Sequence, residues 1–497
     1  MSAVPIDLWL SSSAQALSLL PTGLMALLGI NLGALVLLRL RSPIVIDNPD
    51  RRSSATPTAN WPSVVVQLPV FNEGLLVRPC LEAIARLDYP TDKLSVQLLD
   101  DSDDGSAADN RLHAHQIAQH TGLQIDVIHR VDRAGFKAGA LAAGLSHTQA
   151  EMAVIFDVDF TPSPDFLQRA LLPLLHDPSV GFVQARWAHR NPHSSWLTRA
   201  QAALLDAHFW VEQAARYRNG LPIAFNGTCG VWRLSTIAAA GGWQGDTLSE
   251  DLDLSMRAQF AGYRGVFLDD LPVTGELLTS ARAWQQQQFR WTKGHAQVLR
   301  KLGPRLLTAP WPRLSRLAVL LQIAQGLFFP LAALSLLLSL PGVILESPPH
   351  GMLAALVSVI GLSGLLGASL FLGLGRRLAG SSWARTVIET MGAMILLGGL
   401  LISNSRAALE GLAGRSSALI RSDKPGARGQ TQNRAPRSAA ALPVAQTLAG
   451  LSILGLFLLE QAWNAPFLAT TALGLLAVAL PQWQSSLPIL RKLAEIT

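Results

Sequence analysis

The feature that most constrains the fold is a short apolar run that ends in two aspartates. The run from Met152 to Phe156 is uncharged and contains β-branched residues, which is typical of a strand buried on both faces of a parallel sheet. It is followed by Asp157 and Asp159, whose spacing points both side chains to the same side of an extended chain. Because ligands of open α/β sheets bind beyond the carboxyl ends of the strands, we expect these carboxylates to face a binding crevice.

Apolar residues are unevenly distributed along the 497-residue chain. Only 15% of the residues are charged, whereas a soluble enzyme has about a quarter. Residues 60–300 have the pattern of a soluble domain, and most of the remainder is apolar enough for a membrane. Within the domain, strand-like runs alternate with helix-like runs. This alternation predicts βαβ units and a parallel, doubly wound α/β sheet.

Composition also narrows the class of partner. Two cysteines, Cys80 and Cys229, are too few for a disulfide scaffold and fit a reducing cytosolic domain. The net charge of +6 raises the question of nucleic acid. The basic residues, however, cluster beside apolar segments, where the positive-inside rule explains them. We see no basic face interleaved with aromatic residues, so nucleic acid is not an expected partner.

The first apolar segment sets the expected orientation. Residues from Ala14 to Leu38 are uncharged and long enough to span a bilayer. Arg39 and Arg41 follow this segment, whereas only Asp7 is charged before it. Basic flanks stay in the cytoplasm. The amino terminus is therefore expected outside, with the following domain in the cytoplasm.

Later apolar runs predict two membrane hairpins and one surface helix. The run Val387–Ser403 is short for a span and carries Glu389, which is costly at the bilayer centre. If it crossed, the basic residues of 404–443 would lie outside, against the positive-inside rule. The expected organisation is a transmembrane helix (1–40), a cytoplasmic catalytic domain (41–278), interfacial helices (279–316), a transmembrane hairpin (317–375), an interfacial helix with a cytoplasmic loop (376–443), a second hairpin (444–482) and a cytoplasmic tail (483–497), giving five spans.

Polar clusters follow successive predicted strands, so they meet at one sheet edge. Asp100 and Asp101 end the second strand, where a doubly wound fold holds the base or ribose of a nucleotide. Lys137, at a predicted helix start flanked by glycines, can place a positive charge on a diphosphate. Asp157 and Asp159 supply hard oxygen ligands suited to Mg²⁺ or Mn²⁺. Each cluster alone is also explained by a turn or a cap, but together they predict a metal-bound nucleoside diphosphate.

Three further motifs follow the strand that carries the paired aspartates. Two glycines in Phe225–Gly230 permit close approach of a ligand to the backbone, or form a tight turn. Ser249–Asp251 precedes a helix and reads either as a capping signal or as a source of a general base. At the end of Gln285–Trp291, a tryptophan offers a flat stacking face beside an arginine, which suits a sugar next to a phosphate.

Taken in order over residues 64–424, these motifs resemble family 2 glycosyltransferases of the processive polysaccharide-synthase type. Phe71–Glu73, Lys137–Leu141, Phe225–Thr228 and Gly241–Trp243 further resemble the cellulose-synthase-like A group, which includes plant mannan synthases and bacterial glucan synthases. The resemblance implies a doubly wound nucleotide-sugar-binding catalytic domain inserted between transmembrane α-helices. It also implies a multi-pass protein of the inner or plasma membrane.

The resemblance implies a role for each motif. Asp251 is the expected base, with Glu250 as the fallback, and Asp157 and Asp159 are the expected metal ligands for Mg²⁺ or Mn²⁺. Leu419–Lys424 is the best counterpart of a mobile loop that covers the family's active site. The other expected contacts are Glu73, Asp100, Asp101, Lys137, Asp157, Arg290, Ser422 and Lys424 with the nucleotide-sugar, and Phe225, Asn226, Gly227, Thr228 and Trp291 with the acceptor.

The expected reaction is inverting transfer of a hexose to a growing β-linked polysaccharide, which the membrane spans then secrete. UDP-glucose is the favoured donor and GDP-mannose the other candidate. The alternative is a non-processive enzyme that makes a glycolipid on diacylglycerol or a polyprenyl phosphate. The tryptophan motif and the number of later spans favour the polysaccharide, because a lipid acceptor needs no exit channel. The oligomeric state is left open.

Overall fold

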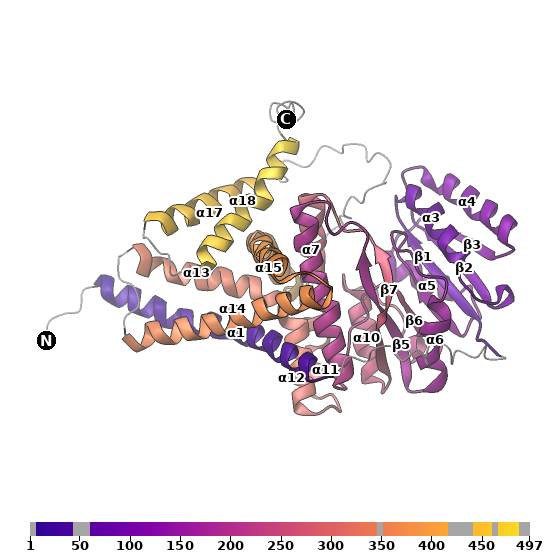
Figure 1. The fold of residues 1–497 in the computed structure, drawn as a ribbon, viewed down its shortest axis with the longest axis horizontal. Coiled ribbons are helices and arrows are strands. Elements are labelled where there is room, and N and C mark those ends of the chain that lie inside the picture. Colours follow the sequence, from indigo (N-terminus) through magenta and orange to yellow (C-terminus); the bar gives the residue numbers. More distant parts are fainter. Residues whose placement is uncertain (1–5, 43–59, 345–350, 416–440, 460–465, 487–497) are drawn as a thin grey trace.

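The structure is a computed structural model that describes residues 6–42, 60–344, 351–415, 441–459 and 466–486. A sheet domain occupies one end of the molecule, and long helices extend from it toward the other end (Figure 1). The chain's described amino-terminal helix, α1 (Ile6–Arg41), belongs to the helical end.

Seven strands form one mixed sheet in the order β3-β2-β1-β4-β6-β5-β7. The first four strands pair in parallel, which confirms the predicted α/β class. The fifth neighbour in this order, β6, runs antiparallel to both β4 and β5, which the alternating pattern did not predict. The strand bounds are β1 Val64–Val70, β2 Leu94–Asp100, β3 Gln124–His129, β4 Met152–Ile155, β5 Val180–His189, β6 Gly230–Arg233 and β7 Arg264–Gly275.

The reversal of β6 has a local cause. Cys229, just before β6, donates its backbone N–H to the carbonyl of Ile155 at the end of β4, over 2.8 Å. The chain therefore enters the sheet from the edge where the parallel strands end. A strand that starts at that edge must run against its neighbours, and this places the preceding loop beside the carboxyl end of β4.

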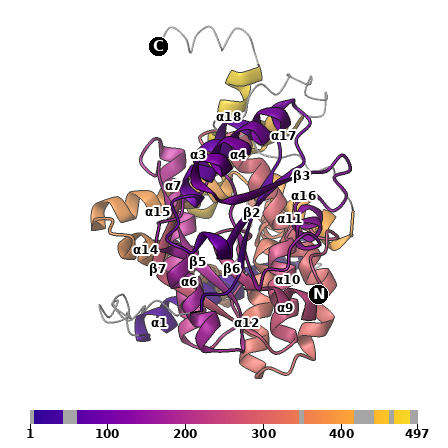
Figure 2. The ribbon, with the colours of Figure 1, turned by 90° about the vertical axis from the view of Figure 1, so that its right-hand side faces the viewer.

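Helices cover both faces of the sheet, as a doubly wound fold requires. The buried cluster on one face includes Val77, Ala114 and Leu167, and the cluster on the other face includes Leu141 and Leu254. Figure 2 views these layers from the sheet end. The helices of the first face are α3 (Gly74–Ile84), α4 (Ser106–Thr121) and α6 (Phe166–His176), and those of the second are α5 (Phe136–Leu145), α9 (Leu234–Ala239) and α10 (Glu250–Phe260).

The helical end begins with a long interrupted helix that packs on the sheet domain. In this helix α7 (Trp196–Asp206) continues through the π-helix η2 (Ala207–Gln213) into α8 (Ala214–Arg218). The remaining elements are α11 (Ala281–Leu307), α12 (Arg313–Ile323), η3 (Ala324–Leu327), α13 (Phe328–Ile344), α14 (Gly351–Leu378), α15 (Trp383–Gly398), α16 (Leu401–Leu412), α17 (Ala441–Leu459) and α18 (Pro466–Ser486).

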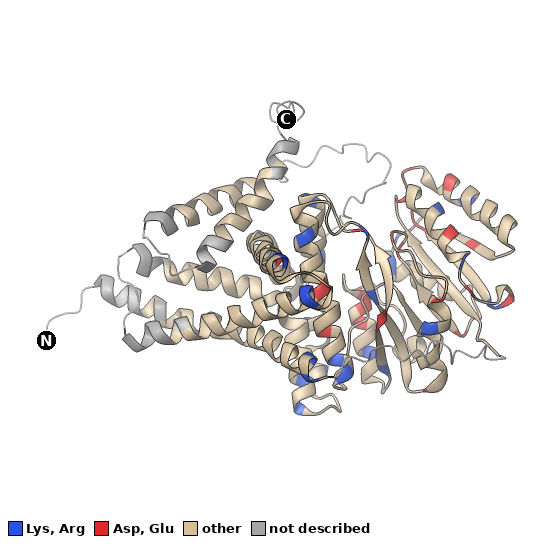
Figure 3. Ribbon diagram, viewed as in Figure 1, with Lys and Arg blue, Asp and Glu red and all other residues tan. Residues whose placement is uncertain are grey.

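Three helical stretches among the described residues are long and apolar enough to cross a membrane: Ala16–Arg41, Arg313–Ser339 and Val359–Leu378. The pair α15 and α16 would make a fourth, although the two helices meet at 58°. Figure 3 shows these helices almost free of charged residues, which gather in the sheet domain and at its junction with them. The predicted surface helix Val387–Ser403 is divided between the two bent helices, and its placement, like the second hairpin and the orientation, stays a prediction.

Glu389 in α15 is paired with other polar side chains. Its carboxylate accepts a hydrogen bond of 2.8 Å from Arg376 at the end of α14 and one of 2.9 Å from Ser381. Arg376 also pairs with Asp206 at the end of α7. A buried charge is tolerated when it is paired and hydrogen-bonded. This network therefore removes much of the free-energy cost that we expected for Glu389 at the bilayer centre.

Helices α1 and α14 cross where both lack side chains. A Cβ on Gly29 would overlap the backbone of Gly364, and a Cβ on Gly367 would overlap the carbonyl of Gly29. Such close approach of small residues is how apolar helices associate in membranes, where packing and not the hydrophobic effect drives contact. The crossing therefore fixes α1 against α14.

We expect Gly29→Ala to destabilise the protein although alanine is the better helix former. The added methyl group forces the two backbones apart, which costs about 1–3 kcal/mol for overpacking. The measurement is the apparent Tm of the detergent-solubilised protein. Gly23→Ala in the same helix is the matched control, because a Cβ there has nothing within 4 Å. Equal Tm values for the two variants would contradict the crossing.

Candidate active site

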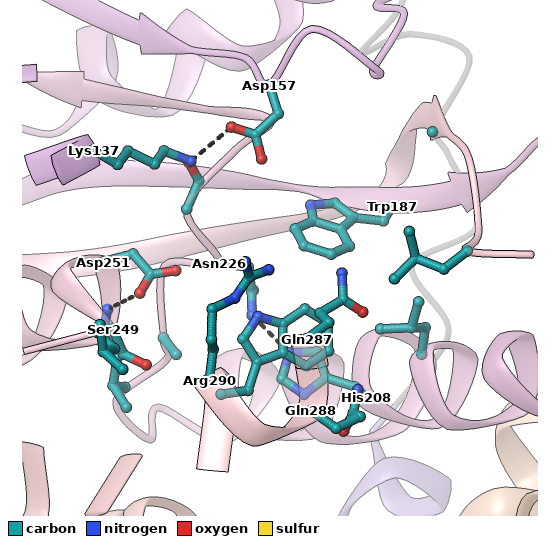
Figure 4. Close-up of a pocket in the computed structure, with 18 of the residues that line it drawn as sticks. Lys137, Asp157, Trp187, His208, Asn226, Ser249, Asp251, Gln287, Gln288 and Arg290 are labelled. Atoms are coloured by element: carbon teal, nitrogen blue, oxygen red, sulfur yellow. Dashed lines mark hydrogen bonds and ion pairs between the residues drawn. The ribbon is translucent and has the colours of Figure 1, made fainter. Parts of the chain in front are cut away.

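A cavity of about 550 Å³ opens at the edge of the sheet where β4 ends. It is bounded by the end of β4, the loop before β6, the amino terminus of α10, the π-helix η2 and helix α11. Figure 4 shows the side chains that point into it. Eleven of the residues predicted from the sequence line this one cavity: Asp101, Lys137, Asp157, Asp159, Phe225, Asn226, Gly227, Glu250, Asp251, Arg290 and Trp291.

Lys137 links three segments that are distant in sequence. Its ammonium group, from the first turn of α5, donates to Asp157 Oδ1 over 2.7 Å and to the carbonyl of Gly227 over 2.9 Å. Burial alone would lower the pKa of Lys137, but the neighbouring charges of Asp157 and Glu250 outweigh it and raise the pKa. The side chain therefore stays cationic and offers a positive charge to an anionic ligand.

Gly227 allows Asp251 to come close to this lysine. The residue has φ +80°, and a Cβ there would lie 2.7 Å from Asp251 Oδ2 and 3.6 Å from Lys137 Nζ. Glycine is thus required both by the backbone conformation and by the space. The sequence predicted a close approach of the backbone to a ligand, and the structure shows a close approach to a carboxylate of the site.

Glu250 and Asp251 form the first turn of α10. Burial, followed by the charge of Asp251, raises the pKa of Glu250 to about 7. Burial also raises the pKa of Asp251, against the opposing effects of the Leu252 backbone N–H and Lys137. The preceding Ser249 makes no side-chain capping bond, so the capping alternative is not what the structure shows. The pair can exchange a proton near neutral pH, as a general base must.

Trp291 and Arg290 face the same cavity from α11. Trp291 is half-buried, so it lines the cavity and is not a core residue. The helix that carries it is held in register by Asn404 of α16, which donates to Thr292 over 2.9 Å, and by a 2.9 Å ion pair between Lys293 and Glu410. An aromatic face beside a guanidinium group therefore stands on a rigid support.

Other predicted residues lie at the margins of the cavity or outside it. Asp101 is held by two hydrogen bonds from Arg130, of 2.8 and 2.6 Å. Asp100 is fully buried and accepts from the Ser102 backbone and from Asn110, so it shapes the turn and does not line the cavity.

Glu73 and Thr228 are also buried, and neither lines the cavity. Glu73 is the residue before α3. The hydroxyl of Thr228 accepts the backbone N–H of Asp157 over 2.8 Å, which orients the strand end. The predicted roles of Glu73 and Thr228 as ligand contacts stay predictions. Ser422 and Lys424 lie outside the described residues.

Sequence reasoning missed a second polar wall of the cavity. His208 and Glu212 from η2, Trp187 from the end of β5 and His295 from α11 all line it. Trp187 follows a strand to the same sheet edge, so the rule that located the aspartates applied to it as well. The i, i+4 spacing of His208 and Glu212 was visible in the sequence, but nothing in it indicated a π-helix.

The residues present fit a divalent metal. Both Asp157 and Asp159 line the cavity at the end of β4, and carboxylate oxygens are the ligands that Mg²⁺ and Mn²⁺ take. Among the described residues, no group of three or more His, Cys, Asp or Glu side chains is close enough to hold a metal. Two protein carboxylates completed by the phosphates of a ligand match the way Mg²⁺ is bound at nucleotide sites.

The mixed α/β sheet with helices on both faces is of the GT-A type. One solved structure with a similar fold is that of the mannosyltransferase PcManGT from Pyrobaculum calidifontis, determined with GDP-Man and Mn²⁺. The two share 18% identity and a TM-score of 0.50, over 81% of this chain and 100% of that one. At this identity the likeness shows the fold alone.

The family follows from sequence comparison. Residues 62–294 match the model described as "Glycosyltransferase like family 2" and form a family 2 glycosyltransferase domain. Glucomannan 4-beta-mannosyltransferase 2 of Arabidopsis thaliana is 40% identical over 265 residues, which are 51% of this chain and 50% of the relative. Glucomannan 4-beta-mannosyltransferase 1 of Oryza sativa subsp. japonica is 40% identical over 264 residues, 52% and 50% of the two chains.

These relatives confirm the predicted resemblance to the cellulose-synthase-like A group and the prediction of an enzyme. The chain spans about half the length of the curated relatives it matches. The predicted preference for UDP-glucose finds no support in their names, which are those of mannosyltransferases. The cytoplasmic placement of the domain stays a prediction.

We expect Asp251→Asn to slow sugar transfer strongly while donor binding persists. Loss of a general base lowers the rate by roughly 10²–10⁴-fold, whereas the charge that holds the donor's diphosphate resides on other groups. Transfer is followed with radiolabelled donor, and donor binding by titration calorimetry. Asp126→Asn, an exposed change on β3, is the control. An equal loss of donor binding in Asp251→Asn would move Asp251 into the nucleotide pocket.

We expect the transfer rate to fall as the pH drops through about 7, the pKa of Glu250. Glu250 and Asp251 are adjacent and their ionisations are coupled, so a proton taken up by the pair on the acid side also occupies Asp251 for part of the time, and a protonated carboxyl accepts no proton. Glu250→Gln removes one of two coupled charges, so the remaining carboxyl ionises at lower pH. The acid limb of the pH–rate profile should then shift to lower pH, whereas Glu82→Gln on the exposed face of α3 should leave it in place. An unshifted limb would show that the two carboxyls act independently.

Proposed function

We propose that the protein transfers mannosyl residues from GDP-mannose to a growing β-linked glycan that leaves through the membrane part of the chain. One observation carries this proposal. A single cavity joins the cationic and acidic groups at the sheet edge to Trp291, and it continues to Gln325, Phe329 and Leu397 of the helices beyond. An acceptor can therefore lie between the donor and the candidate spans. The choice of mannose is supported by the names of the relatives.

The reaction assigns a task to each group. An acceptor hydroxyl attacks the anomeric carbon, the bond from that carbon to the phosphate oxygen breaks, and the nucleoside diphosphate leaves with inversion. Asp251 takes the proton of the attacking hydroxyl. Lys137 and Arg290 stabilise the negative charge that develops on the leaving diphosphate, because preorganised cations favour such a transition state. Asp157 and Asp159 would hold Mg²⁺ or Mn²⁺, which when bound helps neutralise the diphosphate.

The membrane placement is part of the proposal. The apolar stretches in α1, in α12–α13 and in α14 would cross the inner or plasma membrane. The basic residues at their domain-side ends, such as Arg39, Arg41, Arg376 and Arg377, favour a cytoplasmic catalytic domain and an outer amino terminus. This arrangement puts the nucleotide-sugar on the side where cells make it.

The test compares donors on purified protein. We expect label from GDP-mannose to enter a polymer that a β-mannan-specific hydrolase degrades, and label from UDP-glucose to enter poorly. Chelation should abolish incorporation, and added Mg²⁺ or Mn²⁺ should restore it, because the two aspartates alone leave the diphosphate charge uncompensated.

Three results would contradict parts of this function. Label from UDP-glucose alone would assign a glucan synthase. Label that partitions into organic solvent would assign the glycolipid alternative. Full activity after exhaustive chelation would remove the metal.

A further inference from the structure

The π-helix η2 forms one wall of the cavity, and the proposed reaction gives no role to its residues. It interrupts an otherwise continuous helix from Trp196 to Arg218, and π-helical turns are frequent at functional sites. Two of its side chains, His208 and Glu212, line the cavity. Both take part in a chain of hydrogen bonds that reaches Asn226 in the loop before β6.

The hydrogen bonds of this chain have a definite direction. Gln213 donates through Nε2 to the backbone carbonyl of Ala224 over 2.7 Å, and a carbonyl can only accept. This bond fixes the orientation of the Gln213 amide. The same Nε2 donates to Asn226 Oδ1 over 2.6 Å, so the Asn226 amide is also fixed, with its NH₂ group toward His208.

The orientation of Asn226 in turn assigns the tautomer of His208. Asn226 Nδ2 lies 2.9 Å from His208 Nε2, so that ring nitrogen accepts. The other ring nitrogen, Nδ1, then donates to Glu212 Oε2 over 2.9 Å. Figure 4 shows the contact between His208 and Asn226 as a dashed line.

The far end of the chain is anchored by buried charge. Glu212 Oε1 accepts from Arg216 Nε over 3.1 Å, and Arg216 is fully buried. Burial alone would raise the pKa of Glu212, but the hydrogen bond from His208 and the charge of Arg216 lower it to about 2. Glu212 is therefore ionised and holds the His208 ring in place.

We propose that His208 is a positioning residue that orients the Asn226 amide toward a hydroxyl group of the sugar acceptor. The Asn226 NH₂ group has two hydrogens, and His208 takes one of them. Because Asn226 lines the cavity, the second hydrogen is available to an oxygen of a bound sugar. This inference rests on the proposed function and adds the residues that read the acceptor.

The position of this wall indicates that it contacts the acceptor and not the donor. In Figure 4, Lys137 and Asp157 lie on one side of Asn226 and His208 lies on the other. η2 also packs against α1 and α14, two of the helices with candidate spans. The wall that bears His208 therefore adjoins the helices through which the proposed glycan leaves, and the diphosphate-binding groups lie away from it.

The test is a double-mutant cycle on full-length purified protein, with GDP-mannose as donor and a β-linked manno-oligosaccharide as acceptor. His208→Leu should raise the KM for the acceptor about tenfold, the effect of losing one hydrogen bond to a bound ligand, and leave the KM for the donor unchanged. Asn226→Ala should do the same. If His208 acts through Asn226, the double variant should be no worse than Asn226→Ala alone.

Two further variants separate positioning from folding. His208→Gln should recover most of the acceptor affinity, because its amide oxygen can accept from Asn226 where the ring nitrogen did. His176→Leu is the matched control: His176 is exposed on α6 and bonds only to its own helix, at Leu172, over 2.7 Å.

Additive losses in the cycle, or a rise in the donor KM equal to that for the acceptor, would overturn the role of His208. A wild-type protein that transfers no mannose would overturn the proposed function instead.

Discussion

The ammonium group of Lys137 is the interaction on which the rest of the site depends. Asp157, Glu250 and Asp251 converge on one cavity, and burial removes hydration from Glu250 and Asp251. Like charges in a low-dielectric site raise one another's pKa values and weaken the fold unless a cation is present. Lys137 supplies that cation and feels the charge of all three acids. Its bond to Gly227 O also ties the loop before β6 to the end of β4.

A second set of charges joins the catalytic domain to the helices beyond it. Arg376 at the end of α14 pairs with Asp206 of α7 and with Glu389 of α15, while Asp206 lies 3.3 Å from His189 at the end of β5. Because α7 continues into η2, this network positions the same helix that carries His208 and Glu212. This network thus fixes the position of the polar wall relative to both the sheet and the candidate spans. The wall can therefore contact an acceptor that passes from the sheet domain to the spans.

Much of the site was predictable because the carboxyl ends of parallel strands lie at the same edge of the sheet. That rule alone brought Asp157, Asp159 and Lys137 together, and it would have found Trp187. For Asp100, this rule must be combined with the alternation of side chains along a strand. Neighbours in a strand point to opposite faces, so Asp100 and Asp101 could not both face the cavity; Asp100 turns into the fold. The antiparallel β6 and the π-helix were not predictable, since neither leaves a periodicity in the sequence and both depend on tertiary packing.

Burial makes the adjacent acids at the start of α10, Glu250 and Asp251, stronger bases. A carboxylate in water is a weak base, because its pKa lies near 4. Burial raises the pKa of both Glu250 and Asp251, and their mutual repulsion separates the two ionisations. A proton taken up by this coupled pair on the acid side therefore competes with the role of Asp251 as the base. Gly227 leaves room for Asp251 beside Lys137, whose charge favours the ionised form of Asp251 at the point where the acceptor hydroxyl must lose its proton.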